Sequence, residues 1–102
     1  MLELRPNCEL CDRDLPPGTP DARICSYECT FCAACVDEVL HDVCPNCGGG
    51  FQPRPIRPAQ ARREGTGLVA DPPGERRRHT PYSREEIEAF ARTLRGVAPA
   101  ER

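Results

Sequence analysis

The stretch that decides the fold is CSYECTFCAACVDEVLHDVCPNC, residues 25–47, which holds six of the eight cysteines in the chain. With Cys8 and Cys11 upstream, the full spacing is C-x2-C-x13-C-x3-C-x2-C-x2-C-x8-C-x2-C, a series of four close pairs. A short spacer lets one turn present two sulfurs to the same ion, and a closed tetrahedral zinc site takes four such ligands. The cysteines therefore predict two four-thiolate sites and two Zn²⁺ ions as cofactors.

A disulfide framework is the first alternative, because an even number of cysteines is also typical of small secreted domains. The opening residues Met1–Pro6 contain no apolar core and no small-residue cleavage site, so they do not resemble a signal peptide. We therefore expect a cytoplasmic protein whose thiols stay reduced and free to bind metal. An iron–sulfur cluster stays open, since four thiolates suit iron as well as zinc.

The division of the ligands between the two ions follows from a predicted helix. Apolar residues after Cys32 recur at i, i+3, i+4 and i+7, which predicts a helix from about Ala33 to Asp42. This helix would hold Cys35 and Cys44 roughly 13 Å apart, whereas two sulfurs on one zinc lie about 4 Å apart. An interleaved arrangement is favoured, with Cys8, Cys11, Cys32 and Cys35 on one ion and Cys25, Cys29, Cys44 and Cys47 on the other.

A sequential arrangement remains the alternative, with Cys8, Cys11, Cys25 and Cys29 on one ion and the last four cysteines on the other.

The residues between Cys11 and Cys25 are expected to include a loop at Asp14–Asp21, which is dense in turn formers. A short strand or hairpin is expected at Arg23–Cys29. Ile24 and Tyr27 of this hairpin are expected to pack against the helix.

The order of the ligands resembles that of the RING finger, a cross-braced two-zinc fold. Leu10 stands just before the second ligand, Phe31 just before the fifth, and Cys44–Cys47 is similar to the C-P-x-C pair of that family. Cys29 stands where the family usually has histidine. The resemblance covers roughly residues 8–48 and implies a small, metal-stabilised α+β fold, a RING-like or treble-clef module with one short helix, which we assign to residues 1–50.

More narrowly, the chain is similar to domain-of-unknown-function family 1272, a group of small bacterial cysteine-rich proteins, over about residues 1–58. The similar runs are Met1–Cys8, Asp21–Cys25 and Cys44–Gly49. This resemblance implies a fold and a bacterial origin but no activity. RING membership would imply ubiquitin ligation, yet Val39 stands where ligases tend to carry tryptophan and Gly48 where they often carry a cation.

The second half of the chain has a different composition. Residues 51–80 are rich in proline and arginine and predict a mostly disordered linker. Residues 81–96 predict an amphipathic helix, with Ser83 and Glu86 as a capping box, and residues 97–102 a disordered tail. The apolar face of the helix is formed by Ile87, Phe90, Ala91 and Leu94. Whether it docks on the zinc module or waits for a partner is open, and we favour the second.

Charge and the lack of a catalytic constellation narrow the function. Residues 1–50 carry three arginines and nine acids, a net charge of −6, and the remainder carries eleven arginines and seven acids, a net charge of +4. The acidic first half, residues 1–50, is expected to repel nucleic acid.

No set of catalytic residues can be recognised. His41 and His79 are expected on polar surfaces, and eight cysteines fill both metal sites without leaving a position for water. The sequence therefore predicts no enzyme.

The favoured function is a non-catalytic zinc-binding module that acts as a protein-interaction adaptor, with Leu10, Val39 and Pro45 presented to an unknown protein partner. The alternative is a zinc- or redox-responsive thiolate switch, in which oxidation releases metal. A ubiquitin-ligase-like or nucleic-acid-binding role has less support. We expect no small-molecule substrate and no membrane partner.

Overall fold

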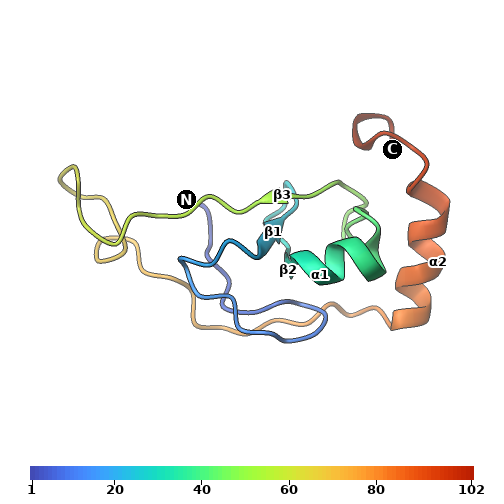
Figure 1. The fold of residues 1–102 in the computed structure, drawn as a ribbon, viewed down its shortest axis with the longest axis horizontal. Coiled ribbons are helices and arrows are strands. Elements are labelled where there is room, and N and C mark those ends of the chain that lie inside the picture. The colour runs from blue at the N-terminus through green and yellow to red at the C-terminus, as the bar shows by residue number, and fades with distance from the viewer.

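The computed structural model describes residues 1–102 and contains three short strands and two principal helices. In a three-stranded antiparallel sheet, β1 (Ala22–Ile24) lies between β2 (Thr30–Cys32) and β3 (Gln52–Pro53), and the helix α2 (Arg84–Leu94) follows along the chain (Figure 1). The elements in chain order are β1 (Ala22–Ile24), β2 (Thr30–Cys32), α1 (Ala33–Cys35), the π-helical turn η1 (Val36–Leu40), β3 (Gln52–Pro53), α2 (Arg84–Leu94) and the 3₁₀ turn η2 (Pro99–Glu101). This small α+β architecture is the one that the sequence predicts.

The hairpin β1–β2 forms because Cys25–Cys29 makes a tight turn between the strands. The Cys25 N–H donates to the Cys29 carbonyl at 3.2 Å, and Glu28 takes a positive φ of 67° at the tip. Tyr27 lies at this tip and is 73% exposed, so the expectation that it packs against the helix is wrong. The turn points the Tyr27 side chain into solvent, because the buried thiols of Cys25 and Cys29 occupy its inner side.

The predicted helix begins where expected and ends slightly earlier. Cys32 is its N-cap, and its sulfur accepts a hydrogen bond from the Cys35 N–H at 3.5 Å. The last turn widens into η1, and the chain leaves the helix at His41 with a left-handed φ of 50°. The helix therefore spans residues 33–40 instead of 33–42. Its buried residues join the main core, where the Phe31 and Phe51 rings meet edge to face at 5.5 Å.

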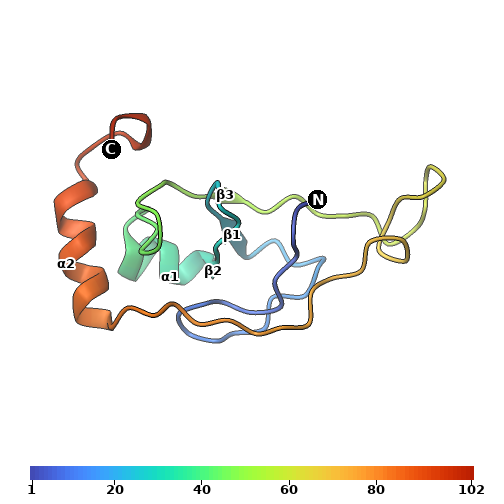
Figure 2. The ribbon, with the colours of Figure 1, turned by 180° about the vertical axis from the view of Figure 1, so that it is seen from behind.

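The segment at 51–80 departs from the disordered linker that its composition predicts. It leaves β3 in an extended course, makes an exposed loop far from α2, and returns along the N-terminal residues (Figures 1 and 2). Arg77 forms ion pairs with Asp12 and Asp14 at 2.9 and 2.6 Å, and the Thr80 N–H donates to the Glu9 carbonyl at 2.8 Å. Hydrogen bonds of backbone groups and ion pairs of arginine side chains hold this segment, in place of buried apolar side chains. Its composition, which is poor in apolar residues, therefore did not predict that it packs on the module.

The C-terminal helix packs against the first half instead of standing free. α2 starts with the predicted capping box, in which the Ser83 hydroxyl accepts from the Glu86 N–H and the Glu86 carboxylate accepts from the Ser83 N–H. Ile87 and Ala91 are each only 1% exposed, and Ile87 belongs to the core cluster that contains η1. The preference for a helix held in reserve is therefore not what the structure shows.

The expected disordered tail also has contacts. After α2 the chain forms η2, and the Arg102 guanidinium donates to the carbonyls of Asp42 and Gly48 at 2.9 and 3.0 Å. These bonds hold the last residues beside the second cysteine cluster. The molecule is elongated, with extents of 46 × 26 × 18 Å, and none of its helices has the length and apolar character needed to cross a membrane.

Candidate metal centres

The first cysteine cluster contains the four residues that the helix-length argument assigns to one ion. The sulfurs of Cys8, Cys11, Cys32 and Cys35 all lie within 4.8 Å of one another. The Cys11 and Cys32 sulfurs are 3.8 Å apart. Four sulfurs at about 2.3 Å from a tetrahedral ion are about 3.8 Å apart. The cluster therefore has the size of a tetrathiolate metal site.

Two backbone features place this cluster. The Cys8–Cys11 turn closes through a hydrogen bond from the Asp12 N–H to the Cys8 carbonyl at 3.0 Å, with Asp12 at a positive φ of 65°. Glu9 then ties the turn to β2, because its buried carboxylate accepts a hydrogen bond from the Thr30 N–H at 2.6 Å. This pairing brings a turn near the N-terminus against the start of the helix, more than twenty residues later.

The second cluster has three cysteines whose sulfurs lie close together and a fourth cysteine beside them. The sulfurs of Cys25, Cys44 and Cys47 lie within 4.8 Å of one another. Cys29 is outside this set, but it is buried and its thiol interacts with the thiols of Cys25 and Cys44. The structure therefore brings three of the four assigned residues together and leaves Cys29 adjacent to them.

Glycines after Cys47 make the second turn possible. Gly48 has a φ of +82°, which an L-residue rarely adopts, and its N–H donates to the Cys44 carbonyl at 2.7 Å. The Gly49 N–H then points at the Cys47 sulfur at 3.4 Å. Amide groups directed at sulfur stabilise negative charge there, as a thiolate ligand requires.

Electrostatics supports cation binding at both clusters. Burial raises the pKa of the Cys8 thiol, and burial with the neighbouring cysteines also raises the pKa of Cys35. Hydrogen bonds with the thiols of Cys29 and Cys44 lower the pKa of Cys25, and hydrogen bonds with Cys25 and Cys29 raise the pKa of Cys44. Neighbouring thiolates repel one another, so these thiols cannot all ionise without a cation between them. A bound divalent cation offsets the repulsion. The residues of both clusters thus fit a metal ion.

Of the three residues expected to face a partner, Val39 and Pro45 are buried, whereas Leu10 is partly exposed. Leu10 is half-buried against the core, Val39 is only 8% exposed, and Pro45 is buried. Val39 shares the core cluster with Ile87 of α2, and Pro45 lines a groove with the same residue. The surface formed by Val39 and Pro45 is therefore covered by the C-terminal helix, which the sequence could not place.

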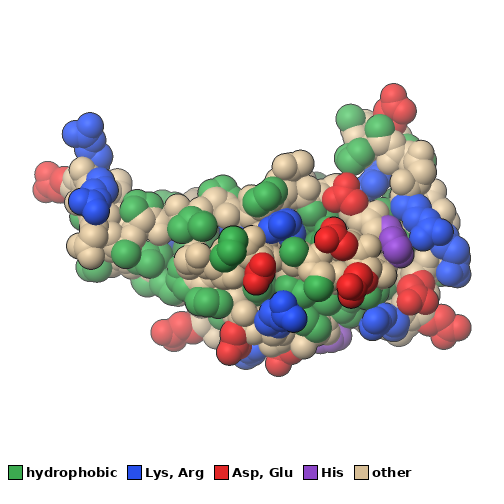
Figure 3. Space-filling view, viewed as in Figure 1, with side chains coloured by type: hydrophobic (Ala, Val, Ile, Leu, Met, Phe, Trp, Pro, Cys, Tyr) green, Lys and Arg blue, Asp and Glu red, His purple; other side chains and the backbone are tan.

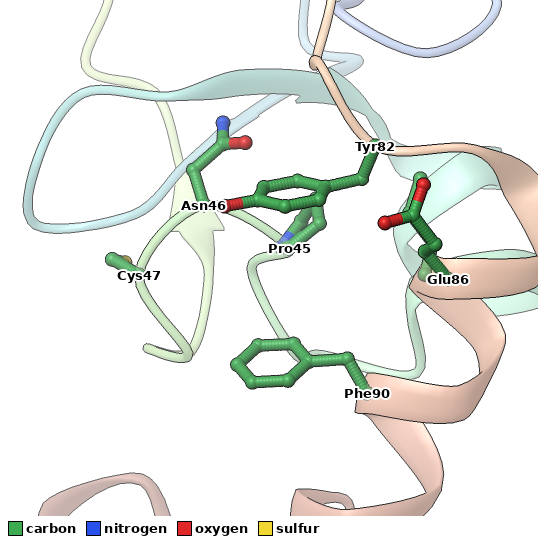
Figure 4. Close-up of a pocket in the computed structure, with 7 residues that line it drawn as sticks. Pro45, Asn46, Cys47, Tyr82, Glu86 and Phe90 are labelled. Carbon is green, nitrogen blue, oxygen red and sulfur yellow. The ribbon is translucent and has the colours of Figure 1, made fainter.

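A groove that the sequence analysis missed lies between α2 and the second cysteine cluster. It has a volume of about 380 Å³ and is lined by Pro45, Asn46, Cys47, Tyr82, Glu86, Ile87 and Phe90 (Figure 4). Tyr82 stands just before the N-cap Ser83, and Ile87 is the fourth helical residue. An apolar pair at these positions is the hydrophobic staple of a helix start, the one local signal that could have revealed this wall.

Comparison with known proteins follows from the cysteine-rich part of the chain. The two clusters alternate along the chain, so that the module is cross-braced. The model of a family described as a protein of unknown function (DUF1272) matches residues 1–57. The chain belongs to this family. The family match ends just after β3 and does not include α2, which supplies one wall of the groove.

A curated relative extends the comparison. An uncharacterized protein of Rhizobium meliloti (strain 1021) is 54% identical over 77 residues, which cover 72% of this chain and 92% of the relative. No solved structure matches the chain. The family match thus covers all eight cysteines, and the description of the family states no activity.

Proposed function

We propose that the chain is a non-catalytic module that binds two Zn²⁺ ions and acts as a protein-interaction adaptor. The observation that carries this proposal is the separation of eight cysteines into two compact sets, one of four sulfurs and one of three sulfurs with Cys29 beside them. Zinc prefers tetrahedral thiolate sites and supplies folding energy to small domains. The proposal includes a cytoplasmic location, where thiols stay reduced.

The composition of the two sets favours a structural role. If Cys29 completes the second set, each ion has four protein ligands and no open position for a reacting water. His41 lies at the end of the helix and His79 in the segment that returns to α2, and neither belongs to a cysteine cluster. A closed metal site has a structural role, because it stabilises the surface of the module around it. We infer that this surface binds a protein partner.

The partner is expected to be a protein instead of a nucleic acid. Residues 1–50 carry a net charge of −6, and bound thiolates make the loaded module more acidic still. Acidic side chains gather over the helical part of the module (Figure 3), where Asp37, Glu38 and Asp42 are exposed. These carboxylates would repel the phosphates of a nucleic acid.

Metal analysis tests the zinc sites directly. We expect two zinc ions per chain in protein purified under reducing conditions, and loss of far-UV circular dichroism when a strong chelator is added. A co-purifying protein that dissociates on chelation and returns with zinc would support the adaptor role. Iron in place of zinc, a single metal ion, or a fold that survives chelation would overturn the two-zinc module.

One observation favours a second candidate, a zinc- or redox-responsive switch. Each cluster has one exposed cysteine, Cys11 in the first and Cys47 in the second, and all eight cysteines are free of disulfides. Oxidation of an exposed thiolate removes a ligand and releases metal. Titration with hydrogen peroxide beside a zinc-sensitive dye separates the candidates: release at micromolar peroxide favours the switch, and release only under harsh oxidation favours the adaptor.

A further inference from the structure

We propose that the groove between α2 and the Cys44–Cys47 turn receives an arginine side chain from a protein partner. This inference rests on the proposed adaptor function and names the chemistry that the partner presents. Its evidence is the shape of the groove and the charge of its lining, which are independent of each other.

The shape suits a flat group on a flexible stem. Tyr82 and Phe90 extend from the α2 side over the same space, and Pro45 closes it from behind (Figure 4). Both aromatic side chains are partly exposed, 42% and 39%, although Ile87 beneath them is fully buried. A planar guanidinium can stack on aromatic faces, where the ring quadrupole attracts a cation. Two rings on one groove can contact such a group from two sides.

The charge of the lining is complementary to a cation. Glu86 is the one charged side chain that lines the groove, and no basic residue does. One of its oxygens, Oε1, accepts from the Ser83 N–H, which leaves Oε2 available to a ligand. Cys47 is exposed and also lines the groove. With the proposed zinc bound by Cys25, Cys29, Cys44 and Cys47, the site would carry a net charge of about −2 and would add negative charge at this wall.

The N-terminus of a helix disfavours a bound cation, but acidic residues at the start of α2 offset this effect. The positive end of the helix dipole lies near the groove. Two acidic residues, Glu85 and Glu86, occupy the first turn of α2, and Ser83 accepts a hydrogen bond from one of its amides. An apolar ligand would remove water from Glu86 and Cys47 without replacing it, which costs free energy. An arginine can pair with the Glu86 carboxylate, lie beside the negative charge near Cys47 and stack on the rings.

The experiment uses the full, zinc-loaded chain labelled with ¹⁵N and a blocked tripeptide, acetyl-Gly-Arg-Gly-amide, followed by amide chemical shifts. We expect millimolar binding, with shifts confined to the residues around the groove. The matching peptide with citrulline, which has the same shape and no charge, should bind at least fivefold more weakly. The lysine peptide should bind between these two, because its ammonium cannot stack as a plane.

Variants identify the groups responsible. Glu86→Gln keeps the helix cap, because glutamine serves at this position of a capping box, and should weaken arginine binding at least threefold. Phe90→Ala should weaken it similarly. Tyr27→Ala is the matched control, since Tyr27 is an exposed tyrosine outside the groove, and should leave binding unchanged.

Three results would overturn the inference: equal binding of the citrulline peptide, preference for a glutamate peptide, or shifts located away from the groove. The metal content and amide spectrum of the same sample are measured first. Two zinc ions and a folded spectrum with no response to arginine would reject the arginine site alone. Missing zinc or an unfolded spectrum would reject the proposed function on which it rests.

Discussion

The guanidinium of Arg54 donates a hydrogen bond from Nη1 to the carbonyl oxygen of Arg5, 2.8 Å away and 49 residues earlier in the chain. Its Nη2 donates to the carbonyls of Leu15 and Pro16, and the side chain is only 4% exposed. One cation thus joins the N-terminal arm, the proline-rich loop and the segment after β3. These carbonyls have no partner in a β-sheet, and Arg54 donates hydrogen bonds to them. Arg54 therefore stabilises the contact between three separate segments of the module.

Replacement of Arg54 should therefore destabilise the protein. Arg54→Lys keeps the charge but cannot reach three carbonyls with one ammonium, and should lower the free energy of unfolding by about 1–3 kcal/mol. Urea denaturation at fixed zinc concentration measures this. Arg76→Ala is the control, because Arg76 is exposed, and should change stability by less than about 0.5 kcal/mol. Equal stability of Arg54→Lys and the unmodified protein would contradict the structural role.

Cys29 should be the fourth ligand of the second ion, although its sulfur lies outside the compact set. Cys29→Ser should leave one zinc tightly bound and allow a chelator to remove the other at lower concentration. Absorbance of a chromogenic chelator measures the release of the first and of the second zinc ion as separate steps. Ser26→Ala, in the same turn and exposed, should release both ions as the unmodified chain does. Two unchanged release steps in Cys29→Ser would assign the fourth position to another group.

Gly48 should tolerate no side chain. Its φ of +82° disfavours an L-residue, and an added Cβ would lie 3.3 Å from Leu94 Cδ1 and 3.5 Å from Phe90 Cζ. Gly48→Ala should cost on the order of 1–2 kcal/mol from the left-handed backbone, and should shift the α2 resonances. Gly18→Ala is the matched substitution, because nothing lies within 4 Å of its added Cβ, and is expected to be neutral or slightly stabilising. Similar melting temperatures for the two variants would contradict this contact.

The docking of α2 should depend on Ile87. This side chain is 1% exposed, and Ile87→Ala should remove about 2–5 kcal/mol of packing. An eleven-residue helix is marginal by itself, so amide hydrogen exchange should accelerate throughout α2 while both zinc ions stay bound. Glu88→Ala, on the exposed face, should keep the slow exchange of the unmodified protein. Protected α2 amides in Ile87→Ala would show that other contacts hold the helix.

The sequence by itself determined the features that depend on local spacing. The periodicity of Val36, Val39 and Leu40 located the helix, and the length of that helix separated Cys35 from Cys44, which predicted the grouping of cysteines that the first cluster displays. Ser83 and Glu86 likewise located the start of α2. These signals are readable because helix rise, capping and ligand spacing are properties of a few neighbouring residues.

Only the tertiary structure decided what covers the module. The docking of Ile87, the burial of Arg54 and the pairing of Arg77 with Asp12 join residues 38 to 65 positions apart. Arginine and proline in residues 51–80 have the composition of a solvated linker, because a buried guanidinium needs carbonyl partners that only the folded chain assembles. For the same reason Val39 and Pro45 could be recognised as apolar, while their covering by α2 depended on a contact between distant segments.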